Sequence, residues 1–236
     1  MAIEFGLLTL GAYLLGSVPA AYLAARWFRG IDIRQFGTGN VGASNLLRLT
    51  SKRIAIPVTI FDVGKGALMI WVAQLLGLDI TQQVTVGLAA IIGHNWPVFL
   101  RFNGGRGILT TLGIVFILAP WPPWLGLIVL VIAYGMAPFR KLALGTIIAM
   151  ASLPIFSWFL PQLFGIEKPL PITLGFAAIF LLAVVRRLTA PRTIFTASVT
   201  PRQLFVNRLL FDRDIRDRKA WIDRRPSEQQ GKQGKG

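Results

Sequence analysis

The residues of this sequence that are best suited to chemistry lie in a glycine-rich stretch between two apolar segments. They are glycines, small polar side chains and one arginine: Gly37, Thr38, Gly39, Asn40, Gly42, Asn45 and Arg48. Closely spaced glycines let backbone N–H groups converge on an anion, because no Cβ atom obstructs the approach. Threonine and asparagine add neutral donors, and the planar guanidinium of Arg48 suits a phosphate. The stretch therefore predicts an anion site, with a flexible Gly/Asn turn as the alternative.

A second glycine-rich turn occurs at residues 101–107, where Gly104 and Gly105 precede Arg106. The only histidine of the chain, His94, stands shortly before this turn. Histidine at such a place is a candidate for orienting a substrate or a loop, and a purely structural role is the alternative. Two turns that each combine glycine, asparagine and arginine predict a composite site for two anions.

One ionisable pair lies inside an apolar segment. Lys65 follows Asp62 by three residues, so the two side chains share one face of a helix. Ionisable groups at membrane depth predict a functional site. The alternative is a self-paired Asp–Lys that holds two helices together.

The elements that must position these residues are predicted to be membrane-spanning helices. The chain has 236 residues, of which 54% are hydrophobic and only 15% are charged, whereas a soluble domain carries about 25% charged residues. A helix crosses a bilayer in about 20 apolar residues. The candidate segments, some of them short and bounded by proline, are 5–25, 54–76, 83–100, 107–120, 121–137, 142–161 and 170–185. We therefore expect an all-α polytopic membrane protein with about seven transmembrane helices.

The basic residues predict how these spans are oriented. If the N-terminus lies outside, the alternating connections place 23 of the 25 Lys and Arg residues on the inner side, in agreement with the positive-inside rule. We therefore expect an outside N-terminus and a cytoplasmic C-terminus. The same distribution divides the chain into a transmembrane domain, 1–185, and a basic cytoplasmic tail, 186–236, whose end is predicted to be disordered.

The tail alternates arginines with apolar residues between positions 202 and 218. This pattern predicts either an amphipathic helix on anionic lipid or a helix packed against the cytoplasmic face of the protein. The net charge of +15 is compatible with nucleic acid, but a membrane protein with basic inner loops explains it, and we expect no nucleic-acid partner. The lack of cysteine and the single histidine argue against a metal site, and no P-loop spacing occurs. We expect no cofactor.

Several short motifs occur in a characteristic order over residues 11–113. They are Gly16-Ser17-Val18-Pro19 with Tyr22, Gly30-Ile31-Asp32-Ile33-Arg34, Gly37-Thr38-Gly39-Asn40-Val41-Gly42-Ala43-Ser44-Asn45 with Arg48, Asp62 with Lys65-Gly66, Gly93-His94 with Pro97, and Phe102 with Gly104-Gly105-Arg106-Gly107. In combination they resemble the PlsY family of acyl-phosphate:glycerol-3-phosphate acyltransferases, which are integral membrane enzymes of bacterial phospholipid synthesis.

The resemblance implies an enzyme that transfers a fatty acyl group from acyl phosphate to glycerol 3-phosphate and forms lysophosphatidic acid. It implies a multi-pass protein of the bacterial cytoplasmic (inner) membrane whose partners are these two substrates and membrane lipid. The expected catalytic residues are Thr38, Asn45, Arg48 and Arg106. The expected ligands of the substrate phosphates are Gly37, Gly39, Asn40, Gly42, Lys65, His94, Gly104 and Gly105.

The chain departs from the family pattern after its last span. The family carries Arg-His-x-x-Asn there, and Arg187 and Ala190 stand at the positions of the histidine and the asparagine. Thr38 and Arg106 replace a serine and a lysine of the family pattern. Two alternative functions stay open: a divergent paralogue that binds lipid without catalysis, and a transporter for a small anion.

Overall fold

The computed structural model describes residues 2–118, 128, 131–132 and 142–223, and every regular element within these ranges is helical. The α-helices are α1 (Ala2–Gly16), α2 (Ala20–Arg29), α3 (Ala43–Leu49), α4 (Lys52–Leu75), α5 (Ile80–Asn95), α6 (Ile108–Leu118), α8 (Leu142–Phe159), α9 (Pro169–Leu188), α10 (Pro201–Phe211) and α11 (Arg218–Ile222). Short 3-10 turns occur at Ile33–Gln35, Val98–Leu100, Gln162–Phe164 and Thr196–Ser198. The prediction of an all-α protein is confirmed.

Four long stretches are apolar enough to cross a membrane: Ala2–Arg29, Lys52–Leu75, Leu142–Phe159 and Pro169–Leu188. The predicted span 5–25 is interrupted, because α1 ends at Gly16 and α2 begins at Ala20 after a proline, which has no N–H to continue the helix. The helix expected at 83–100 ends earlier, at Asn95, since Pro97 follows it. Most of the second span of the predicted pair, 121–137, lies outside the described residues, which include only 128 and 131–132 of it. The count of seven spans and their orientation stay predictions.

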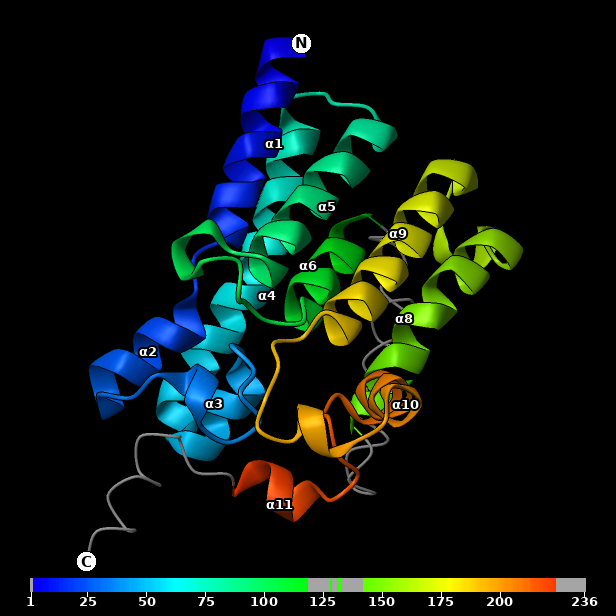
Figure 1. Cartoon of the computed structure of the whole chain (residues 1–236). Coiled ribbons are helices and arrows are strands. Elements are labelled where there is room, and N and C mark those ends of the chain that lie inside the picture. Colours follow the sequence, from blue (N-terminus) through cyan, green and yellow to red (C-terminus); the bar gives the residue numbers. More distant parts are fainter. Residues whose placement is uncertain (1, 119–127, 129–130, 133–141, 224–236) are drawn as a thin grey trace, which may run out of the picture.

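The helices form two groups that meet along α5 (Figure 1). In the first group α1 packs on α5 and α4 packs on α6, while α8 and α9 form the second group. Ile70, Ile114 and Phe176 lie in one buried apolar cluster that connects the groups. Since lipid tails are as apolar as this cluster, close packing rather than transfer from water must hold the helices together.

Glycines provide that close packing. Gly66 of α4 faces the backbone carbonyl of Thr110, and Gly113 of α6 faces the backbone carbonyl of Val63, so each helix offers a glycine to the main chain of the other. A Cβ atom at either glycine would collide with main-chain atoms. The same reciprocal arrangement joins α1 to α5. Small residues of this kind let helix backbones approach closely in a membrane.

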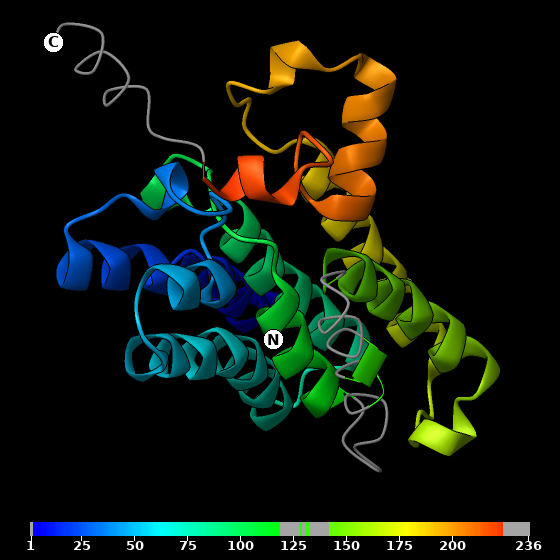
Figure 2. The same cartoon turned by 90° about the horizontal axis from the view of Figure 1, so that it is seen from below.

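The tail is folded as far as the structure describes it. Helix α9 continues to Leu188, three residues beyond the predicted domain boundary, and α10 packs on α9 and α8 (Figures 1 and 2). A capping box of Thr200 and Gln203 starts α10, which satisfies N–H groups that a helix start leaves free. Of the two alternatives for the tail, the packed helix is the one observed for α10. Residues 224–236, predicted to be disordered, lie outside the described part of the chain.

A buried ion pair fixes the end of α10. The guanidinium of Arg208 donates to Asp214 (Nε to Oδ1, 2.8 Å) and to the carbonyl of Leu188 at the end of α9 (2.7 Å). Burial opposes ionisation of Asp214, but hydrogen bonds from Arg208, Thr196 and Thr193 together hold its pKa below the ordinary value. The tail is thereby attached to the last span through charged groups.

Candidate active site

The side chain of Asn45 forms hydrogen bonds with the backbone of the first glycine-rich turn. This side chain is fully buried in α3, and its Oδ1 accepts a hydrogen bond from the backbone N–H of Thr38 (2.9 Å). Its Nδ2 donates to the carbonyls of Phe36 and Asn40 (both 3.1 Å) and, at 3.3 Å, to that of Ile33. Asn45, expected among the catalytic residues, therefore positions Thr38 and Asn40 from behind.

Gly37 lets the turn approach this amide. Its φ of +58° lies in the left-handed region, which side chains with a Cβ rarely adopt. A Cβ atom there would also collide with Oδ1 of Asn45. The turn consequently directs Thr38 and Asn40 outward, while Gly37 itself lines none of the larger cavities described below.

The second turn is held by α5 and α9. Gly104 and Gly105 donate their backbone N–H groups to the carbonyls of Asn95 and His94 (3.2 and 3.0 Å). Arg186 of α9 donates to the carbonyls of Gly105 and Gly104 (3.0 and 2.8 Å). The second turn, and the Arg106 backbone with it, is thus fixed between two helices.

Lys65 is buried at the junction of α1, α4 and α5. Its Nζ lies 2.8 Å from Oδ1 of Asp62, 2.8 Å from Nδ1 of His94 and 3.1 Å from the carbonyl oxygen of Gly16. A lysine ammonium only donates, so Nδ1 of His94 accepts and Nε2 carries the ring proton. These contacts correspond to the alternative in which Asp62 and Lys65 pair with each other. Lys65 lines none of the larger cavities.

Three cavities of similar size adjoin one another around the two turns. The first, about 340 Å³, is strongly basic and opens between the turns and the tail. Its charged lining is Arg34, Arg106, Arg186, Arg187, Arg192, Arg208, Arg213, Asp212 and Asp214. The second, about 370 Å³, reaches α3 and α11, and the third, about 330 Å³, is mainly apolar and extends between α3, α4 and α6. Asn40 and Arg106 line all three.

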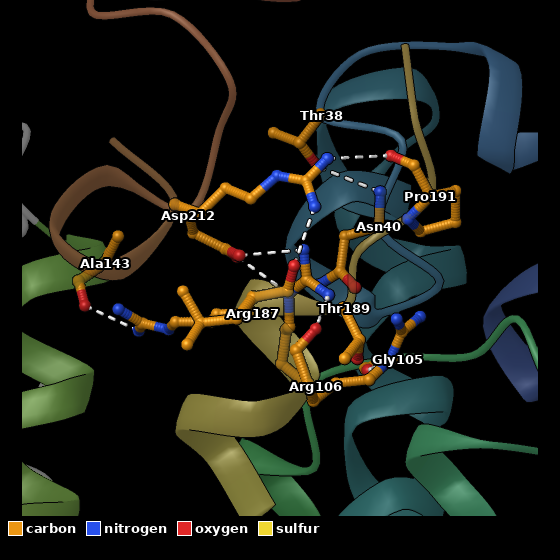
Figure 3. Close-up of polar contacts among 12 residues, drawn as sticks. Thr38, Asn40, Gly105, Arg106, Ala143, Arg187, Thr189, Pro191 and Asp212 are labelled. Atoms are coloured by element: carbon orange, nitrogen blue, oxygen red, sulfur yellow. Dashed lines mark hydrogen bonds and ion pairs between the residues drawn. The ribbon is translucent and has the colours of Figure 1, made fainter. Parts of the chain in front are cut away.

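Arg106 forms an ion pair with Asp212, a residue of the tail (Figure 3). Asp212 accepts from Nε of Arg106 (3.0 Å) and pairs with Nη2 (2.7 Å), while Nη1 donates to the carbonyl of Arg186 (3.1 Å). Asp212 adopts a left-handed conformation, with φ of +55°, where α10 ends. The turn after α10 thus brings the tail into the site.

Arg187, which the sequence analysis aligned with the histidine of the PlsY pattern, is bound by other parts of the protein (Figure 3). Its guanidinium donates to the carbonyls of Ala143 (2.7 Å) and Leu209 (2.6 Å) and to the hydroxyl of Thr146 (2.8 Å). It therefore connects α9 to α8 and α10 along one wall of the cavities.

The structure brings most, but not all, of the expected site residues together. Those that line the three cavities are Thr38, Gly39, Asn40, Gly42, Arg48, His94, Gly104 and Arg106. Those that lie behind them are Gly37, Asn45, Lys65 and Gly105. The sequence analysis did not assign Asp212, Arg213 or Arg218 to the site. The signal that could have found them is the capping box at Thr200, which predicts a folded tail.

The comparisons with known proteins identify the family of this chain. A family profile described as glycerol-3-phosphate acyltransferase matches residues 6–197. Glycerol-3-phosphate acyltransferase 4 of Dehalococcoides mccartyi (strain CBDB1) is 46% identical over 224 residues, 95% of each chain. Glycerol-3-phosphate acyltransferase of Pseudomonas aeruginosa (strain PAO1) is 38% identical over 170 residues, 72% of this chain and 87% of that one.

Two solved structures of a glycerol 3-phosphate acyltransferase are also similar to this chain. The crystal structure of PlsY, an integral membrane glycerol 3-phosphate acyltransferase, in its glycerol 3-phosphate form is similar with a TM-score of 0.68 and 32% identity. The alignment covers 78% of this chain and 88% of that chain. The lysophosphatidic acid form of PlsY matches with a TM-score of 0.66 and 31% identity.

Proposed function

This chain belongs to the glycerol-3-phosphate acyltransferase family, and from that premise we propose that it transfers a fatty acyl group from acyl phosphate to glycerol 3-phosphate. The product is lysophosphatidic acid. The observation that carries the proposal is the junction of the second cavity, which Arg48 lines, with the apolar cavity at Asn40 and Arg106. A donor with a phosphate at one end and an acyl chain at the other fits such a junction, and the first, strongly basic cavity remains for the acceptor.

The chemistry requires little beyond placement and charge neutralisation. Acyl phosphate is a mixed anhydride, so a hydroxyl of glycerol 3-phosphate attacks its carbonyl carbon directly. The new C–O bond forms as the C–O bond to phosphate breaks, and phosphate leaves with the electron pair. The hydroxyl proton passes to a phosphate oxygen of the leaving group. Holding both substrates in this geometry supplies much of the rate.

Thr38, Asn40 and Arg106 are the residues we assign to the reacting groups. The Thr38 hydroxyl accepts weakly from the backbone N–H of Asn40 (3.4 Å), which leaves its own proton available for the substrate. Oδ1 of Asn40 is buried and has no hydrogen-bond partner among the described residues, so this amide oxygen can accept a hydrogen bond from a hydroxyl of glycerol 3-phosphate. Donors directed at a developing oxyanion or a leaving phosphate stabilise the transition state more than the ground state.

Arg48 is assigned to the donor phosphate, and the acyl chain to the apolar cavity. That cavity is lined by Leu47, Ile56, Leu109 and neighbouring residues of α3, α4 and α6. We place the enzyme in the bacterial cytoplasmic membrane with both turns on the inner side. The distribution of basic residues supports this placement.

The test is product formation by the purified protein in detergent. Glycerol 3-phosphate is supplied with either palmitoyl phosphate or palmitoyl-CoA, and we expect lysophosphatidic acid from palmitoyl phosphate only. Arg48→Ala should abolish turnover, whereas Arg53→Ala, at an exposed arginine on α4, should not. A folded protein that binds lipid but forms no product from either donor would instead support the non-catalytic paralogue.

A further inference from the structure

Five arginines line the second cavity, and three of them, in two separate parts of the chain, carry the inference. Arg48 comes from α3, whereas Arg213 follows α10 and Arg218 begins α11. Burial, and then the nearby charge of Arg218, lower the pKa of both Arg48 and Arg213. Arg218 is therefore close enough to repel both Arg48 and Arg213, which are partly shielded from water.

These charges lack compensation within the part of the chain that the structure describes. The side chains of Arg48 and Arg218 have no hydrogen bond or ion pair with a described residue. Arg213 stacks over the ring of Phe211 at 5.2 Å, and its buried Nε has no partner. Asp217 raises the pKa of Arg213, but its carboxylate accepts two backbone N–H groups at the start of α11.

The second aspartate near the cavity is also occupied. Asp212 is bound to Arg106 by two contacts. A cluster of converging guanidinium groups without carboxylate partners is costly to the empty protein, and an anion that bridges them would remove that cost. Because guanidinium groups bind phosphate oxygens bidentately, a phosphate group suits the cavity.

We propose that Arg213 and Arg218 of the tail join Arg48 in a subsite for the phosphate of the acyl donor. The inference rests on the proposed function and names the part of the site that the donor occupies. It extends the site beyond residue 197, where the match to the family ends. The tail is then part of the substrate-binding machinery.

The arrangement of the cavities distinguishes the donor from the acceptor. The second cavity shares Ser44, Ile108, Leu142 and Thr146 with the apolar cavity, in addition to Asn40 and Arg106. The first cavity shares only Asn40 and Arg106 with it. A molecule whose acyl chain lies in the apolar cavity thus has its phosphate in the second cavity, which leaves the first for glycerol 3-phosphate.

The test is a comparison of kinetic constants for the two substrates in full-length Arg218→Ala and Arg213→Ala. A hydrogen bond to a charged group corresponds to roughly a 10-fold or greater change in affinity. We therefore expect KM for palmitoyl phosphate to rise about 10-fold in both variants. KM for glycerol 3-phosphate should be unchanged in Arg218→Ala, because Arg218 lines the second cavity and not the first, whereas Arg213 lines both. Arg216→Ala changes an exposed arginine of the same tail that lines none of these cavities, and it should match the wild type. Arg218→Lys keeps the charge and should recover part of the affinity.

Two results would overturn the subsite while the proposed function stands. One is an unchanged KM for palmitoyl phosphate in both alanine variants, and the other is a rise confined to KM for glycerol 3-phosphate. Binding of dodecyl phosphate, which has no acyl group to transfer, tests the subsite even if the wild type forms no product. Weaker calorimetric binding by folded Arg218→Ala than by Arg216→Ala supports the subsite, and equal binding refutes it.

Discussion

Replacing Asn45 by alanine tests whether this residue positions the first glycine-rich turn or acts on the substrate directly. The buried amide accepts from the Thr38 N–H and donates to three carbonyls at 3.1–3.3 Å, so its two N–H bonds are shared among them. Asn45→Ala removes about three effective hydrogen bonds, and at about 1 kcal/mol each the turn loses about 3 kcal/mol. That loss corresponds to a roughly 100-fold increase in the open population of the turn.

The assay is amide hydrogen exchange of the peptide that contains Thr38 and Asn40, together with turnover. We expect Asn45→Ala to lose most of the protection of the Thr38 amide, and to lose activity because the turn no longer holds its residues. Thr38→Ala should lose activity while exchange stays close to that of the wild type. If Asn45→Ala abolished turnover with exchange and melting temperature unchanged, Asn45 would act on the substrate, and the reasoning would be refuted.

Three further outcomes are expected. Thr38→Ser should stay active and Thr38→Ala should lose about 100-fold in kcat, since only the serine keeps the hydroxyl. Steady-state kinetics measures both variants. If their kcat values were equal, Thr38 would have no part in the reaction. Gly105→Ala should lower the melting temperature because its methyl group meets the ring of His94, whereas Gly64→Ala, with open space around it, should not. Because the folded pKa of Asp214 lies below its ordinary 3.8, its contribution to tail docking is present above that value and lost as the pH falls through the folded pKa. Trp221 fluorescence should report this acid transition, and a profile that Asp214→Asn leaves unaltered would contradict it.

The helices and the two turns could be predicted because their signals are local. Hydropathy and charge marked α4, α6, α8 and α9, and the glycine spacing marked the turn that carries Thr38 and Asn40. The interruption of the first span also had a local signal, since Pro19 follows Gly16 by three residues. Elements whose formation depends on nearby residues were therefore accessible from the sequence.

The directions of polar side chains could not be predicted, because they depend on contacts between distant segments. Nothing near Asn45 indicates that its amide turns inward to Thr38. Arg186 and Arg187 read as the basic flank of a span, yet both are almost fully buried and bind backbone carbonyls. The docking of the tail likewise depends on the pairing of Arg106 with Asp212, 106 positions apart.

The reciprocal glycines between α4 and α6 limit which second mutations could suppress a defect at either position. The atoms that exclude a larger residue at Gly66 or Gly113 include the main-chain carbonyls of Thr110 and Val63, which no substitution can make smaller. A defect caused by Gly66→Ala or Gly113→Ala should therefore have no second-site suppressor that acts by trimming a facing side chain. Revertants selected from either variant should restore glycine itself, so these positions would change rarely as the sequence diverges.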